Sequence, residues 1–178
     1  MGKNCLVIID MQRGFFNANT AKVMYPICQL ADSRLFDTVV ATVFKNSLDS
    51  NYVKFLGWQK MISKSEQRLP KKISVRCDYV FEKTGYTCFT DEFCNFISAE
   101  QISRLFFVGI DLDCCILKSA CDCFELGIDF KVITDCCASK GGYVSEESAK
   151  IVLMRLIGER QMITSEVLYN GIGDDISA

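Results

Sequence analysis

Apolar residues are concentrated in six short runs of strand length along the chain. Most of these runs are continuous rather than alternating, which is typical of strands buried on both faces of a parallel sheet. The runs comprise residues 5–9, 38–44, 79–81, 105–108, 130–133 and a weaker one at 161–164. These segments are expected to form the strands of a buried sheet.

Segments with helical periodicity lie between the apolar runs, at residues 24–35, 92–97, 116–124 and 146–157. Thr90 and Ser145 are suited to cap the second and fourth of these helices, and Gly127 is suited to end the third. Strands that alternate with helices indicate a parallel sheet covered on both faces. The predicted fold is therefore α/β, a Rossmann-like three-layer sandwich with a mostly parallel six-stranded sheet and helices on both faces.

The length of 178 residues predicts a single domain over residues 1–178. Residues 45–77 form one long polar span, which carries Phe55 and Trp58 among lysines and serines. Because this span is too long for a simple connection, we expect it to hold a helix and to form a lid or a subunit contact. The end of the chain after Asn170 is expected to be frayed.

Charge and hydropathy narrow the range of partners. The net charge is −2 and the pI is about 5.3, which disfavours binding to nucleic acid or to an acidic membrane surface. No apolar stretch approaches the length of a membrane span, and residues 5–9 are too short for the apolar part of a signal peptide. The sequence predicts a cytoplasmic protein with no nucleic-acid or membrane partner.

The chain contains eleven cysteines and no histidine. Because histidine and Cys-x-x-Cys spacing are both absent, no metal site is expected. For Cys5, Cys123 and Cys136, which lie in apolar segments, the expected role is that of a small buried hydrophobe. A catalytic cysteine in this chain must find its base among carboxylates or lysines.

Three polar residues follow predicted strands. Asp10 ends the first strand, Lys83 follows the third, and Cys115 follows the fourth after a short turn, where a helical pattern begins. In open α/β sheets, ligands bind at the carboxyl ends of the strands. Taken singly, these residues have the ordinary interpretations of a loop cap, a surface lysine and an inert thiol. The prediction of a site therefore rests on their coincidence at one edge.

The chemistry of these three groups is complementary. A lysine ammonium and a helix N-terminus both favour a thiolate at Cys115. Asp10 can take the thiol proton and pass it to a leaving group. The turn before Cys115 directs backbone N–H groups at a developing oxyanion. The predicted chemistry is nucleophilic catalysis by a cysteine.

Four motifs carry a family resemblance. They are residues 7–12 with Phe15, Lys83 with residues 87–89, Gly109 with residues 113–116, and residues 135–139. On these motifs the chain resembles the isochorismatase-like cysteine hydrolases, and the resemblance covers roughly residues 4–165. The resemblance implies a catalytic triad of Asp10, Lys83 and Cys115. Cys115 is preferred to Cys114 because the cysteine of the family follows an Asp-x step.

The resemblance also implies further features of the site. A cis, non-proline peptide bond is expected at Ile110–Asp111, and the backbone N–H groups of Asp111 and Cys115 are expected to form the oxyanion hole. Phe15, Trp58 and Tyr86 are candidate substrate-binding residues, although plain packing is the more ordinary role for each of them.

The activity that the resemblance implies is hydrolysis of a small amide or N-carbamoyl compound through a thioester, without a cofactor, in a homo-oligomer. Metal-dependent nicotinamidases of the family use an Asp and histidines after the second strand, whereas residues 43–46 of this chain contain no histidine. Neither nicotinamidase activity nor a metal is therefore expected. Vinyl-ether cleavage of the isochorismate type is also disfavoured, because that branch does not need a cysteine nucleophile.

Two alternatives stay open. Arg13 and Asp111 depart from the family pattern, and a second carboxylate at position 111 would either repel a thiolate or bind a cationic substrate group. The first alternative is a catalytically impaired member that acts as an oligomeric binding or scaffold protein. The second is a thiol redox protein, suggested by the pairs at 114–115 and 136–137. It is the weaker of the two, because neighbouring cysteines rarely form unstrained disulfides.

Overall fold

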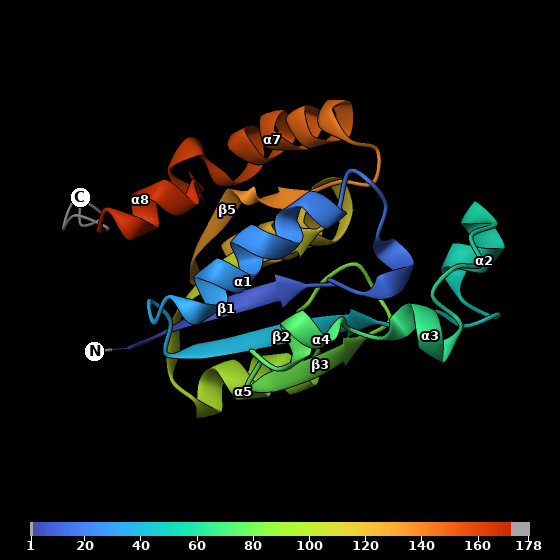
Figure 1. Ribbon diagram of the computed structural model, residues 1–178, viewed down its shortest axis with the longest axis horizontal. Helices are drawn as coiled ribbons and strands as arrows, with labels where there is room; N and C mark the ends of the chain where they lie inside the picture. Colours follow the sequence, from blue (N-terminus) through green and yellow to red (C-terminus); the bar gives the residue numbers. More distant parts are fainter. Residues whose placement is uncertain (1, 172–178) are drawn as a thin grey trace.

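The computed structural model of the chain describes residues 2–171, so the predicted frayed end lies almost entirely outside the described residues. The strands are β1 (Lys3–Ile9), β2 (Thr38–Phe44), β3 (Tyr79–Lys83), β4 (Ile102–Ile110), β5 (Asp129–Ala138) and β6 (Met162–Ile163). They form one sheet in the order β3-β2-β1-β4-β5-β6, with every neighbouring pair parallel (Figure 1). The predicted parallel six-stranded sheet is confirmed.

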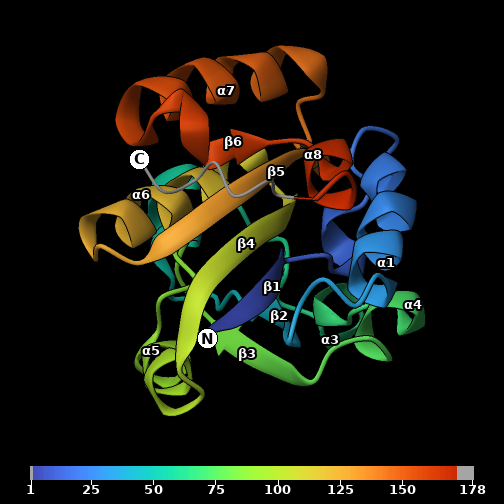
Figure 2. The same ribbon diagram turned by 90° about the vertical axis from the view of Figure 1, so that its left-hand side faces the viewer.

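Helices cover both faces of the sheet. α1 (Met24–Asp32), α4 (Lys71–Ser74) and α8 (Ser165–Tyr169) lie against one face, whereas α5 (Asp91–Ala99), α6 (Leu117–Glu125) and α7 (Tyr143–Ile157) lie against the other (Figure 2). Leu6 and Ile8 of β1 pack into the first of these two cores, while Val7 and Ile9 pack into the second. Burial on both faces explains why the apolar run of β1 is continuous. Within residues 2–171, no helix has the length and apolar character needed to cross a lipid bilayer.

Two helix boundaries differ from the prediction. α5 begins at its predicted cap, where the side chain of Thr90 accepts a hydrogen bond from the backbone N–H of Phe93. α7, however, begins directly after Gly142 and not at Ser145, so the predicted cap was wrong. Gly142 has a φ of 73°, which glycine adopts readily, and its carbonyl accepts from the N–H of Glu146. α1 ends at Asp32, three residues earlier than predicted.

β5 is longer than its apolar run because the polar Thr134 interrupts the run without ending the strand. Its pairing with β4 shifts register between Phe107 and Gly109 and resumes with Gly109 opposite Cys137. The strand therefore continues to Ala138. This extension brings the loop after β5 to the carboxyl edge of the sheet.

The segment 45–77 contains α2 (Asn51–Leu56), α3 (Lys64–Gln67) and α4, so the prediction of a helix within it is confirmed. Figure 1 shows α2 beyond the carboxyl ends of β1, β2 and β3. Ile73 of α4, in contrast, is buried in the same core as α1. The segment thus contributes both to the core and to the edge where ligands bind in this class of fold.

Candidate active site

The three residues of the predicted triad meet at the carboxyl edge of the sheet. Asp10 directly follows β1, Lys83 ends β3, and Cys115 lies in a turn of π-helix (η3, Leu112–Ile116) between β4 and α6. Lys83 Nζ lies 2.7 Å from Asp10 Oδ2 and 3.4 Å from Cys115 Sγ. All three residues are buried. The fold therefore brings an acid, an amine and a thiol together in the protein interior.

The hydrogen bonds of Lys83 leave one carboxylate oxygen of Asp10 without a donor. The ammonium donates to the carbonyls of Gly85 and Tyr86, at 2.9 and 3.1 Å, and to Cys115 Sγ. The ammonium also lies 2.7 Å from Asp10 Oδ2, with which it forms an ion pair. Among the buried side-chain N and O atoms of residues 2–171, Asp10 Oδ2 alone has no hydrogen-bond partner. This oxygen is therefore free to accept a proton.

Thr42 orients the carboxylate of Asp10. Its Oγ1 donates to Asp10 Oδ1 at 2.7 Å and accepts from the backbone N–H of Asp10 at 3.2 Å. Asp10 itself has a φ of 52°, which is uncommon outside glycine and recurs at functional sites. Sequence reasoning missed Thr42, because a threonine in the middle of a buried β-strand is typical of plain packing.

The protonation states follow from burial and from charges within the triad. Burial raises the pKa of Cys115 most strongly, Asp10 raises it further, and Lys83 offsets only part of this, so the pKa lies well above its ordinary value. Lys83 favours the thiolate, as expected, but burial and Asp10 oppose it. Burial by itself would lower the pKa of Lys83, but Asp10 and Cys115 raise it by more, so this lysine stays charged.

Gly109 allows β4 to approach β1 beside the triad. Its φ is 121°, and a Cβ at this position would lie 2.2 Å from the carbonyl oxygen of Ile9. The peptide bond Ile110–Asp111 is cis, as expected. The carbonyl of Asp111 then accepts from the N–H groups of Cys114 and Ile116 and so shapes the π-helical turn around Cys115. The role of the Asp111 and Cys115 N–H groups as an oxyanion hole stays a prediction.

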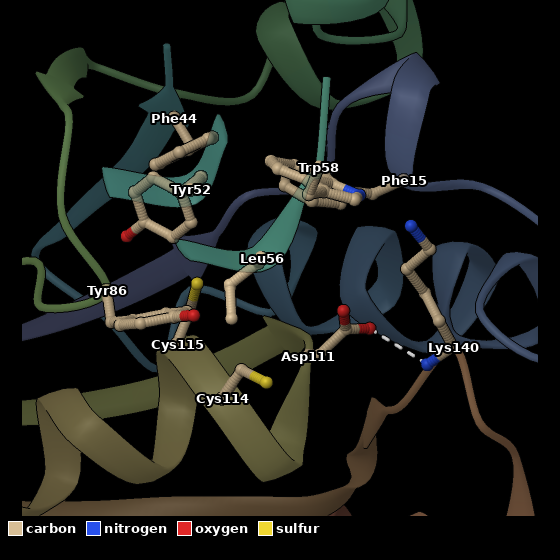
Figure 3. A pocket seen from close by; sticks show the side chains of 10 residues that line it. All are labelled: Phe15, Phe44, Tyr52, Leu56, Trp58, Tyr86, Asp111, Cys114, Cys115 and Lys140. Atoms are coloured by element: carbon tan, nitrogen blue, oxygen red, sulfur yellow. Dashed lines mark hydrogen bonds between the residues drawn. The ribbon is translucent and has the colours of Figure 1, made fainter. Parts of the chain in front are cut away.

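A pocket of about 290 Å³ opens above Cys115 (Figure 3). The three predicted wall residues, Phe15, Trp58 and Tyr86, all line it. Arg13, in contrast, is exposed and does not line this pocket. The other lining residues are Phe44, Tyr52, Leu56, Asp111, Cys114, Cys115 and Lys140. Half of the ten residues that line the pocket are therefore aromatic.

Sequence reasoning missed several of these lining residues. Phe44 ends β2 and could have been found by the same strand-end rule that identified Asp10. Lys140 was hidden because the apolar run of β5 stops before the strand does. Tyr52 and Leu56 lie on α2 within the segment 45–77, where no periodic signal marks them.

The pocket has two chemically different ends. At the thiol end, the rings of Tyr52 and Tyr86 meet edge to face at 5.1 Å. At the other end, the rings of Phe15 and Trp58 stack at 6.1 Å. Lys140 Nζ lies 5.4 Å from the ring centre of Phe15 and 5.8 Å from that of Trp58, within the range of a cation–π contact.

The loop after β2, where no metal ligand is expected, is held together by Asn46. Asn46 follows β2, and its amide donates to the carbonyls of Trp58 and Lys60, while its oxygen accepts from Ser47 and Ser50. Its polar atoms are thus occupied in holding the loop. Residues 2–171 contain no group of three or more Cys, Asp or Glu side chains placed to bind a metal. All eleven cysteines are free thiols.

Comparisons with known proteins agree with this architecture. The family model of the isochorismatase domain matches residues 4–166. The fold is similar to that of an isochorismatase-like hydrolase from Alkaliphilus metalliredigens, with a TM-score of 0.82, 13% identity and coverage of 94% of this chain and 98% of that chain. It is also similar to N-carbamoylsarcosine amidase from Thermoplasma acidophilum, with a TM-score of 0.79, 21% identity and coverage of 92% of this chain and 97% of that chain. A nicotinamidase/pyrazinamidase from Bacillus subtilis has a TM-score of 0.75 and 20% identity, with coverage of 90% of this chain and 99% of that chain. No curated protein matches the chain in sequence.

Proposed function

The chain belongs to the isochorismatase family, and we propose that it is a cysteine hydrolase that cleaves the C–N bond of a small amide or N-carbamoyl compound through a thioester. The proposal rests on one observation above all. Asp10, Lys83 and Cys115 are in contact at the base of a pocket, with Lys83 Nζ 2.7 Å from Asp10 Oδ2 and 3.4 Å from Cys115 Sγ. The structural similarity to N-carbamoylsarcosine amidase supports the choice of bond.

In the first step, Cys115 Sγ attacks the carbonyl carbon of the substrate while its proton passes to Asp10 Oδ2. Because burial and Asp10 raise the pKa of the thiol, we place the proton transfer together with the attack. The carbonyl π electrons move to the oxygen, and backbone N–H groups of Asp111 and Cys115 donate to the resulting oxyanion. The charged Lys83 beside Cys115 and Asp10 stabilises the negative charge that passes between them.

In the second step, the oxyanion electrons re-form the carbonyl and the C–N bond breaks. The leaving nitrogen takes the proton from Asp10 and departs as ammonia or an amine, which leaves a thioester on Cys115. Water then gives a proton to Asp10 and attacks the thioester carbonyl. The C–S bond breaks, the acid product leaves, and the proton on Asp10 returns to the sulfur.

The scaffold alternative requires Lys83 to be turned away from Cys115 and a pocket that holds no ligand. Lys83 instead donates to Cys115, and the pocket has a volume of about 290 Å³. The geometry therefore supports the hydrolase over the scaffold. The homo-oligomeric state, the cytoplasmic location and a role of residues 45–77 as a lid or interface stay predictions.

The test is Cys115→Ala, with Cys94→Ala as the matched control, because Cys94 is an exposed cysteine on α5 that does not line the pocket. Ammonia release from small amides and N-carbamoyl compounds is measured, together with the intact mass of the enzyme during turnover. We expect Cys115→Ala to lose about 10³-fold or more in kcat and to show no acyl adduct. Normal turnover by Cys115→Ala would rule out the thioester.

A further inference from the structure

The end of the pocket remote from the thiol contains two opposite charges that are not in ion-pair contact with each other. Asp111 and Lys140 both line the pocket. Among residues 2–171, the side chains of these two residues form no ion pair, with each other or with any other group. Both residues are partly shielded from solvent, and a ligand of matching charges can compensate them there.

One oxygen of Asp111 faces the pocket without a donor. Oδ1 accepts a hydrogen bond from the backbone N–H of Lys140 at 2.9 Å. The second oxygen accepts none from the described residues, and Figure 3 shows it pointing into the pocket. The carboxylate is thus anchored through one oxygen, and the other is available to a cationic or N–H group of a ligand.

The ammonium of Lys140 is likewise available. It lies near the rings of Phe15 and Trp58, and no hydrogen bond of this ammonium is formed within residues 2–171. A cation–π contact uses the charge but leaves the N–H donors free. Those donors suit a carboxylate.

The order of the groups across the pocket defines the ligand. Figure 3 shows Asp111 between Cys115 and Lys140. We infer that the pocket selects a zwitterionic amide, such as the ω-amide of an amino acid, whose ammonium group binds Asp111 and whose carboxylate binds Lys140. This inference rests on the proposed hydrolase function, because it places the scissile amide at Cys115. The volume of about 290 Å³ suits a molecule of this small size.

An amide that carries only one of the two charges pairs with either Asp111 or Lys140. The other residue then loses contact with water without gaining a partner. Sites built around polar groups reject analogues that lack the matching group for this reason. A zwitterion satisfies both residues and leaves the filled pocket electrically neutral. The inference therefore predicts that the pocket binds zwitterionic amides more tightly than singly charged ones.

Isothermal titration calorimetry on Cys115→Ala, which cannot form the thioester, tests this directly. The probes are L-asparagine, succinamic acid, β-alaninamide and propanamide. They share a primary amide and carry both charges, the carboxylate alone, the ammonium alone, or neither. We expect L-asparagine to bind about tenfold or more tightly than each of the others.

Further variants in the Cys115→Ala background show which residue recognises which charge of L-asparagine. Asp111→Asn removes the advantage of L-asparagine over succinamic acid, and Lys140→Met removes its advantage over β-alaninamide. Glu92→Gln, which removes an exposed carboxylate on α5 that does not line the pocket, leaves both ratios unchanged. Equal affinities for the four probes, or no binding of L-asparagine, overturn the inference.

Ammonia release by the wild-type protein separates this inference from the proposed function. If L-asparagine binds preferentially but none of the four probes releases ammonia, the inference about the pocket stands and the hydrolase proposal fails for these amides. If propanamide and L-asparagine are hydrolysed with equal kcat/KM, the hydrolase proposal stands and the zwitterion inference fails.

Discussion

The base of the pocket and its wall are built in different ways. The base consists of Asp10, Lys83 and Cys115, which come from strand ends and the turn after β4 and are buried and bonded to one another. Much of the wall comes from the segment 45–77, which supplies Tyr52, Leu56 and Trp58, all at least partly exposed. In this protein the sheet fixes the chemical groups, while a loop segment shapes the space in front of them. Changes to the base should therefore remove turnover, and changes to the wall should alter substrate binding.

The largest expected effect follows from Asp10→Asn. Asparagine cannot take the thiol proton, so we expect kcat/KM to fall by about 10³–10⁴-fold. The change also leaves Lys83 buried without its ion-pair partner, which costs about 3–5 kcal/mol of stability. Ammonia release and urea unfolding measure the two effects.

A double variant separates activity from stability at the base. Asp10→Asn/Lys83→Met removes both buried charges, so it should regain much of the free energy of unfolding while staying inactive. If the double variant recovered activity together with stability, Asp10 would act on folding alone.

The next largest effect concerns the backbone beneath the triad. Gly109→Ala places a Cβ 2.2 Å from the carbonyl oxygen of Ile9, at a φ of 121°, so we expect a loss of about 3 kcal/mol or more in the free energy of unfolding. Gly85→Ala is the matched control, because no atom lies within 4 Å of its added Cβ. It should change stability by less than about 0.5 kcal/mol. Similar urea midpoints for the two variants would contradict this account of the β1–β4 contact.

A wall variant should act mainly on KM. Trp58→Ala removes the ring that stacks on Phe15 at 6.1 Å, so we expect KM to rise about tenfold while kcat changes by less than about threefold. Phe55→Ala is the control, since Phe55 belongs to the same segment, is 79% exposed and does not line this pocket. A loss confined to kcat in Trp58→Ala would show that the wall also places the reacting atoms.

The same division explains what the sequence could and could not predict. Asp10, Lys83 and Cys115 were predictable because the carboxyl ends of parallel strands share an edge, whatever the loops do. Tyr52 and Leu56 were not, since their positions depend on the path of an irregular segment. Lys140 was missed because a polar interruption in β5 was taken for its end.

Electrostatics was the other limit of sequence reasoning. A lysine beside a cysteine lowers the pKa of the thiol, but the sequence does not show how strongly burial opposes this effect. Burial of Cys115 and the neighbouring Asp10 reverse the net effect and raise the pKa of the thiol. Burial depends on packing between distant segments, which no local motif reports.

The smallest expected effect concerns Asp111, which lies in the wall but next to the base. Burial raises its pKa to about 6, Asp113 and Asp10 add to the increase, and the backbone N–H and charge of Lys140 oppose it. A carboxyl group whose pKa is raised on folding stabilises the protein below its unfolded pKa and loses that contribution as pH rises through the folded pKa. Above about pH 6, the wild-type protein therefore carries an unfavourable buried charge.

Asp111→Asn removes this charge, so it should be more stable than the wild type at about pH 8, by about 1 kcal/mol and at most about 3 kcal/mol. At about pH 4, where the wild-type carboxyl is protonated, the gain should vanish. Urea unfolding at both pH values measures this, with Glu92→Gln, a change at an exposed carboxylate on α5, as control. An equal gain at both pH values would mean that packing, and not charge, is responsible. A gain confined to high pH, combined with lost discrimination among charged amides, would show that the protein sacrifices stability at Asp111 for recognition, as binding sites commonly do.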